Sequence, residues 1–209
     1  PDCLSIRGMA LEAKATFKGQ LLKQPVELSD TFLDSKDFIE VEIKRPELSK
    51  RYVARVVTDV AMKESPWWLQ LRLMLSGMRP INNIVDITNY VMLELGEPIH
   101  AFDIRQIKSK KIVVDVAKKN ESFTTLDGTV RTMPHNTLMI KDGDKSVAVA
   151  GIMGGLDSEI VKDTKDILIE AANFNQDSIR LSSKALGLRT EASSRFEKGV
   201  SVTLCQEAV

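Results

Sequence analysis

The sequence predicts an α+β fold, in which mixed and antiparallel sheets are flanked by helices. Helical patterns are prominent in the first half of the chain, and the second half is richer in short strand patterns. Helices and strands are therefore segregated rather than alternating, which favours α+β over a doubly wound fold.

The first 62 residues combine one predicted helix with two predicted strands. Residues 4–18 have helical composition, and Gly19 would end this helix. Residues 20–36 lack clean periodicity and are predicted to form a connecting segment. Residues 37–44 alternate as a half-buried strand, and residues 51–62 predict a second strand.

A second helix is predicted from Ser65, with serine as the cap and Pro66 at the first helical position. It runs to Gly77. Trp67 and Trp68 stand at helical spacing from leucines further along, so we expect both rings in the core.

The next stretch, RPINNIVDITNYVMLELGEPIHAFD, contains a capped helix, a sharp stop and one of the two histidines. Asn83 is the predicted cap, and Asp86 stands where it can bond back to the first turn. Gly96 ends the helix, and Pro98 holds the short segment that carries His100. Four apolar residues at helical spacing predict one buried stripe: Ile84, Ile87, Val91 and Leu95.

Six strands and two helices are predicted in the second half. The strands cover residues 111–118, 121–126, 129–132, 137–141, 147–153 and 166–172. Asp127-Gly128 and Asp142-Gly143 are hairpin turn signals between neighbouring strands. Asn175 can cap a helix that ends at Gly187, and a last helix starts between Thr190 and Ser194, where Ser194 to Glu197 fits a capping box.

Composition restricts the function classes. The chain has 209 residues, 43% of them hydrophobic and 28% charged, which is typical of a soluble globular protein. With 29 basic and 29 acidic residues the net charge is zero, so a nucleic acid would be held mainly by groups elsewhere. Aromatic residues make up only 5%, which argues against a broad stacking platform.

Metal and membrane functions find little support in the sequence. Cys3 and Cys205 lie at opposite ends, and with only two histidines a zinc site is not expected. No apolar run is long enough to span a membrane, and we expect no signal peptide. The chain begins without Met and ends inside an apparent helix, so we expect it to be a piece of a longer protein.

Three features go beyond the needs of a core. His100 is either a satisfied loop histidine or a group that positions or activates a water. The glycines of GIMGG, which follow a predicted strand, either form a turn or let a ligand approach the backbone. Glu170 lies in the apolar segment ILIEAA. It either faces water on an edge strand or is a buried carboxylate that accepts a hydrogen bond from a ligand.

Four motifs follow one another along the chain: RPINNIVDITNYVMLELGEPIHAFD, GIMGG, ILIEAANF and GLRTEASSRFEKG. Together they resemble, in sequence and spacing, the editing region of the bacterial phenylalanyl-tRNA synthetase beta subunit. The likeness runs from about Arg51 to Gly199, and residues 1–50 resemble the lead-in to that region. Ser201-Val202 departs from the family's usual Asp-Pro, outside the implied site.

The resemblance implies a layered editing-domain fold and hydrolysis of tyrosine wrongly attached to phenylalanine tRNA. A pocket built for phenylalanine rejects an added hydroxyl by only about 10²-fold, whereas a second site can bind that hydroxyl directly. The site residues carried over from the family are Arg79, Pro98, His100, Gly154, Glu170, Thr190 and Ala192.

The resemblance also implies a role for most of these residues. Glu170 would accept the hydrogen bond of the tyrosine phenol, and His100 would orient the attacking water. Small Gly154 and Ala192 would leave room for the ring, while Thr190 would hold the polar end of the substrate. Arg79, in turn, would face the terminal nucleotide of the tRNA or brace the segment that carries His100.

The family implies partners and a domain division as well. Residues 1–45 would be a lead-in helix and connecting segment, and residues 46–209 the editing domain, as one body or two interleaved lobes. This region would need no cofactor, whereas the whole synthetase uses ATP and magnesium. Its partners would be phenylalanine tRNA and the alpha subunit of an alpha2 beta2 assembly, in the cytoplasm, without DNA or membrane.

Two other function classes remain open from the sequence. One is a binding lobe that packs against the synthetase or guides tRNA without chemistry. The other is a free amino-acid sensor, for which Arg79 is the candidate partner of the ligand's carboxylate. The discriminating feature is Glu170, because a purely structural lobe does not need a carboxylate, a histidine and glycines around one pocket.

Overall fold

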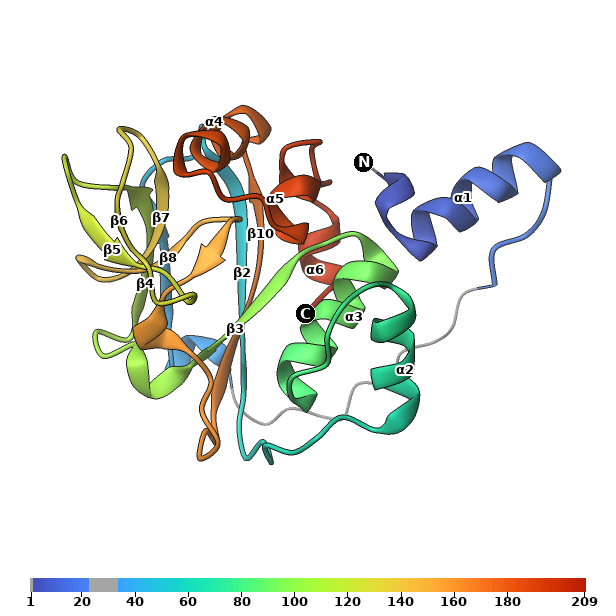
Figure 1. The fold of residues 1–209 in the computed structure, drawn as a ribbon, viewed down its shortest axis with the longest axis horizontal. Helices are drawn as coiled ribbons and strands as arrows, with labels where there is room; N and C mark the ends of the chain where they lie inside the picture. The colour runs from blue at the N-terminus through green and yellow to red at the C-terminus, as the bar shows by residue number, and fades with distance from the viewer. Residues whose placement is uncertain (1, 23–33) are drawn as a thin grey trace.

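The predicted α+β class is confirmed by the computed structural model, which describes residues 2–22 and 34–209. Of the three sheets in the described chain, the five-stranded and the three-stranded one face each other, and most helices lie on the far side of the three-stranded sheet (Figure 1). The connecting segment predicted over residues 20–36 falls largely on residues 23–33, outside the described part of the chain.

The larger sheet has five strands in the order β1-β4-β7-β8-β9. These are β1 (Glu40–Ile43), β4 (Lys111–Val116), β7 (Leu138–Asp142), β8 (Lys145–Val149) and β9 (Met153–Gly154). Only the β1–β4 pair is parallel, so the sheet is mixed as predicted. Both predicted hairpin turns are confirmed: one joins β5 (Ser122–Thr124) to β6 (Val130–Thr132), and the other joins β7 to β8.

The three-stranded sheet, called the smaller sheet from here on, positions the candidate site. Its antiparallel strands run in the order β2 (Ser49–Val57), β10 (Ile167–Phe174), β3 (Ile99–Asp103), so β10 is central. Side chains alternate between its two faces. Phe102 and Leu168 belong to the main core, which includes the five-stranded sheet, whereas Ala101 and Ile167 pack with Ile84 on the helical side.

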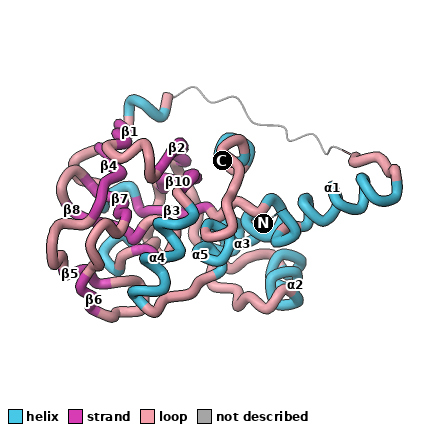
Figure 2. Tube along the Cα trace, turned by 90° about the horizontal axis from the view of Figure 1, so that it is seen from above, coloured by secondary structure: helices cyan, strands magenta, loops and turns pink. Residues whose placement is uncertain are grey.

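Six α-helices complete the described fold. They are α1 (Ile6–Phe17), α2 (Trp67–Leu75), α3 (Asn83–Leu95), α4 (Gln176–Leu186), α5 (Glu191–Phe196) and α6 (Leu204–Glu207). The described chain also has four short 3-10 turns, of which the first precedes α1: η1 (Asp2–Leu4), η2 (Ser35–Asp37), η3 (Ile104–Gln106) and η4 (Leu156–Ser158). Seen from above, α1 extends away from the body and touches it near α3 (Figure 2).

The start of α3 differs from the prediction by one residue. Asn82, not Asn83, is the cap, and its side chain accepts hydrogen bonds from the amides of Ile84 and Val85. Asp86 accepts instead from the Ser65 hydroxyl at 2.5 Å and from the Ile81 amide at 2.8 Å. The acidic residue therefore fastens the preceding loop to the helix rather than closing a capping box.

Two burial predictions for α2 and α3 were wrong. Trp67 and Trp68 are 67% and 53% exposed, because Leu69 and Leu73 occupy the buried side of α2. Trp68 packs edge-on against Tyr90 of α3 instead. In α3 the predicted apolar stripe is broken at Ile87, which is 48% exposed, and the buried residues are Ile84, Asp86, Thr88 and Met92.

The predicted boundary after residue 45 separates β1 from the rest, yet β1 pairs with β4 in the five-stranded sheet. The division into a lead-in and an editing domain stays a prediction. None of the described helices is long and apolar enough to cross a bilayer.

Candidate functional site

Glu170 and His100 are neighbours across the smaller sheet. Their positions are directly paired between β10 and β3, so both side chains leave the sheet on the same face. This face is the one that Phe102 and Leu168 share with the main core. The two residues that the sequence analysis placed in catalytic roles are therefore side by side, and β10 is the central strand rather than an edge.

Glu170 is a buried and sparsely bonded carboxyl group. It is 7% exposed, and its Oε2 accepts a hydrogen bond of 2.7 Å from the Tyr52 hydroxyl. Burial raises the pKa of Glu170 to about 7, against the opposing effect of the Tyr52 hydrogen bond. At neutral pH the group therefore exchanges between a carboxylate that accepts and an acid that also donates.

His100 is a neutral imidazole at physiological pH. Burial lowers its pKa to about 4. Its ring stands edge-on to Phe102, with 4.5 Å between ring centroids. A neutral imidazole has one donor and one acceptor nitrogen, so it can orient a water molecule without adding a positive charge beside Glu170.

Gly154 lies against the His100 ring. A Cβ atom on Gly154 would be 3.0 Å from Nε2 of His100, so any larger residue would press on the imidazole. The other glycines of GIMGG have different causes. Gly151 has a φ of +64° and faces the rings of Phe174 and Phe196, whereas a Cβ on Gly155 would collide with Phe123 and the Val147 carbonyl.

Thr190 brings the start of α5 to the glycine segment. Its hydroxyl donates to the Ile152 carbonyl at 3.0 Å, between the glycines. Thr190 is also the cap of α5 and shares a capping box with Ser193, so the box predicted to begin at Ser194 was wrong. Ala192, two residues later, is partly buried against the main core. Four of the implied site residues, His100, Gly154, Thr190 and Ala192, thus border the same core.

The turn before β3 carries Pro98 and an unexpected buried acid. Pro98 is buried, and Glu97 beside it has 0% exposure, with only weak partners in the Cys205 thiol and the Ala172 backbone. Burial raises the pKa of Glu97 to about 8. Neither Glu97 nor Tyr52 is among the site residues predicted from the sequence. Alternation along β2 could have indicated Tyr52, but no local pattern marks Glu97.

Arg79 is not brought to this group by any contact in the described chain. It is exposed and precedes the Asn82 cap of α3, and α3 packs on the opposite face of the smaller sheet. Its implied role at the tRNA end or in bracing His100 stays a prediction.

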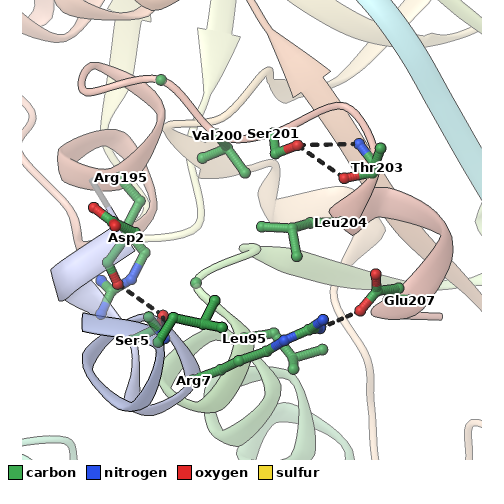
Figure 3. A pocket seen from close by; sticks show the side chains of 14 residues that line it. Asp2, Ser5, Arg7, Leu95, Arg195, Val200, Ser201, Thr203, Leu204 and Glu207 are labelled. Atoms are coloured by element: carbon green, nitrogen blue, oxygen red, sulfur yellow. Dashed lines mark hydrogen bonds and ion pairs between the residues drawn. The ribbon is translucent and has the colours of Figure 1, made fainter. Parts of the chain in front are cut away.

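A cavity of about 290 Å³ is separate from Glu170 and His100, neither of which lines it. It lies between α1, the C-terminal end of α3 and the segment from α5 to α6 (Figure 3). Arg7 and Glu207 form an ion pair at its rim. Within residues 2–22 and 34–209, no three His, Cys, Asp or Glu side chains gather as metal ligands.

Comparison with known proteins assigns this chain to a family. The model of the B3/4 domain family matches residues 48–209. A phenylalanine–tRNA ligase beta subunit of Clostridium acetobutylicum is 52% identical over 210 residues, covering 100% of this chain and 26% of that subunit. The beta subunit of Clostridium tetani is 53% identical with the same coverage, and that of Bacillus cereus is 44% identical over 208 residues. The chain thus spans about a quarter of the length of these curated relatives.

A solved structure supports the fold. The crystal structure of an N-terminal fragment of the phenylalanyl-tRNA synthetase beta subunit from Pyrococcus horikoshii has a TM-score of 0.50 and 17% identity to this chain. It covers 92% of this chain and 58% of that one. The resemblance drawn from the four sequence motifs is confirmed, and the chain belongs to the B3/4 domain family.

Proposed function

We propose that this chain is the editing region of a phenylalanyl-tRNA synthetase beta subunit and hydrolyses the ester of tyrosine wrongly attached to phenylalanine tRNA. The observation that carries the proposal is the pairing of Glu170 with His100 on the inner face of the smaller sheet. Gly154 lies against the His100 ring and has no side chain that would press on it.

Glu170 reads the tyrosine side chain in this proposal. The phenol of the substrate donates a hydrogen bond to the buried carboxyl group, which phenylalanine cannot do. A site that hydrogen-bonds a substrate hydroxyl rejects the analogue without it by about 10⁴-fold or more, because the buried polar group would otherwise be unpaired.

His100 orients the water that attacks the ester carbonyl. Water adds to the carbonyl carbon, the bond to the ribose oxygen breaks, and tyrosine and a free tRNA hydroxyl result. An aminoacyl ester is already activated, so correct placement of water and ester supplies much of the rate. Because His100 is neutral at pH 7, it can accept a hydrogen bond from the attacking water, whose proton passes in the net reaction to the departing ribose oxygen.

The same proposal assigns the partners. Phenylalanine tRNA would be the substrate carrier, and the alpha subunit would join the beta subunit in the assembled enzyme. The whole synthetase would use ATP and magnesium, whereas hydrolysis at Glu170 and His100 would need neither.

The test measures deacylation of tyrosyl and phenylalanyl phenylalanine tRNA, by this chain at high concentration and by the assembled synthetase. The wild-type sequence should hydrolyse the tyrosyl ester selectively, and Glu170→Ala should lower that rate by about 10²-fold or more. Glu94→Ala, at an exposed position on α3, is the matched control and should leave the rate unchanged. No hydrolysis in either setting would instead favour a non-catalytic binding lobe, and equal rates for Glu170→Ala and wild type would remove Glu170 from tyrosine recognition.

A further inference from the structure

Tyr52 reaches Glu170 from the neighbouring strand. In β2 the residue directly opposite Glu170 is Ala54, and Tyr52 stands opposite Ala172. The Tyr52 ring therefore crosses diagonally between strands to bring its hydroxyl to Glu170 Oε2 at 2.7 Å. The small side chain of Ala54 leaves the position facing Glu170 free of bulk.

The Tyr52 hydroxyl serves Glu170 as a donor. Tyr52 is 9% exposed, and in the described part of the chain its hydroxyl makes one hydrogen bond, to Glu170. Burial, followed by the nearby charge of Glu170, raises the pKa of the Tyr52 phenol well above its ordinary value. The phenol thus keeps its proton, and that single proton is directed at one carboxyl oxygen of Glu170.

We propose that Tyr52 is the positioning residue for tyrosine recognition: it holds Oε2 of Glu170 and leaves Oε1 as the acceptor for the substrate phenol. One carboxyl group then binds two phenols, one from the protein and one from the ligand. This inference rests on the proposed function and adds to it the residue that fixes the orientation and charge of Glu170.

The arrangement predicts how Glu170 changes when the Tyr52 hydroxyl is removed. The Tyr52 hydrogen bond lowers the pKa of Glu170, and without it burial acts alone and the pKa rises. The other titratable groups near Glu170 are His100 from β3 and Glu97 from the turn before it, and neither supplies a positive charge at pH 7. In Tyr52→Phe, Glu170 should therefore be protonated at pH 7 and bind the phenol less strongly, since charged acceptors form the stronger hydrogen bonds.

The experiment compares wild type, Tyr52→Phe and Tyr90→Phe between pH 6 and 9. Tyr90 is the matched control, because its hydroxyl contacts Arg72 and it lies on α3, away from Glu170. The first measurement is the midpoint of Glu170 ionisation, from the carboxyl infrared band that disappears in Glu170→Gln. The second is the ratio of tyrosyl to phenylalanyl ester hydrolysis.

In Tyr52→Phe, the midpoint of Glu170 ionisation and the pH at which the hydrolysis ratio is half-maximal should both rise by about one pH unit or more. Neither should move in Tyr90→Phe. The lost selectivity at pH 7 should return at high pH. An unchanged ionisation midpoint would overturn the inference, and so would a shifted midpoint with an unchanged hydrolysis ratio. If neither the wild type nor any variant hydrolyses either ester, the proposed function fails, and the role of Tyr52 in recognition fails with it. The infrared measurement distinguishes this outcome from an error about the Tyr52 hydrogen bond, because it reports the ionisation of Glu170 without any hydrolysis.

Discussion

Two buried carboxyl groups on the smaller sheet contrast sharply. At one end, Asp103 of β3 has 0% exposure and is fully bonded: it accepts from the Arg105 backbone, from the Arg105 guanidinium and from the Thr164 hydroxyl. Three positions along the sheet, Glu170 of β10 is nearly as buried, but among the described residues its side chain accepts a hydrogen bond only from Tyr52.

The pKa values of the two groups follow this difference. Burial by itself would raise the pKa of Asp103, yet the hydrogen bonds from Arg105 and Thr164 outweigh it and hold the pKa below the ordinary value. The single bond from Tyr52 does not outweigh burial at Glu170, whose pKa rises to about 7. A carboxylate with all its bonds made within the chain stabilises the fold, whereas one with few bonds has capacity for a ligand.

The largest effect on hydrolysis is expected from adding a side chain at Gly154, beside His100 and Glu170. In Gly154→Val the new side chain displaces the His100 ring, because even a Cβ would lie 3.0 Å from Nε2. We expect tyrosyl ester hydrolysis to fall by about 10²-fold or more, with little change in melting temperature. Gly19→Val is the control, since a Cβ there meets nothing within 4 Å. Normal hydrolysis by Gly154→Val would place the substrate elsewhere.

The Asp103 end should respond in stability instead of activity. Asp103→Asn weakens the charge-assisted bonds from Arg105 and should lower the free energy of unfolding by about 2 kcal/mol. Glu170→Gln should leave it equal or higher, because a buried and poorly compensated ionisable group is removed. Urea unfolding of both variants at pH 7.5 measures the difference. If the two lose equal stability, the contrast between the two ends does not hold.

Glu97 extends the comparison to a carboxyl group whose weak partners, the Cys205 thiol and the Ala172 backbone, do little to offset its burial. Its pKa of about 8 lies above the ordinary value of 4.5, so folding requires it to stay protonated, and stability falls as pH rises from 4.5 to 8. Glu97→Gln removes this dependence and should gain stability over wild type by up to about 1.4 kcal/mol per pH unit in that interval. Unfolding curves at pH 5, 6.5 and 8 test it, and a constant difference across them would argue against a neutral Glu97.

The smallest effect is expected from His100. Its pKa of about 4 lies below the ordinary 6.5, so the unfolded chain takes up a proton first and stability falls as pH drops from 6.5 to 4. His100→Gln should reduce this acid sensitivity by about 1.4 kcal/mol at pH 5.5, measured by thermal unfolding. His135→Gln, which replaces the other histidine, is the control. Equal acid sensitivity in both variants would show that His100 protonates normally.

The elements that depend on local sequence were predicted well. The α+β class, both Gly-containing hairpin turns, the Asn175 cap and the Gly187 stop of α4 are all present. Each rests on interactions within a few residues, such as a cap bonding to the next turn or a glycine adopting a positive φ.

Errors concentrate where distant segments compete for the same group. Asp86 bonds to Ser65, 21 residues away, so it is not available for the first turn of α3. Trp67 and Trp68 have the spacing of core residues, but the leucines on the other side of α2 are the ones that meet the body of the protein. Helical periodicity identifies a stripe on a helix but does not tell which stripe another element will cover.

The sequence by itself determined the family, the α+β class and most of the turns and helix ends, because these depend on long motifs or on interactions within a few residues. Only the tertiary structure decided that Glu170 lies on a central strand opposite His100, that Gly154 touches the His100 ring, and that Tyr52 and Glu97 belong to the same buried region. These relations depend on strand register and on packing between segments more than 40 residues apart. The pKa of each carboxyl group depends on the balance between burial and hydrogen bonds, and this balance exists only once those segments meet.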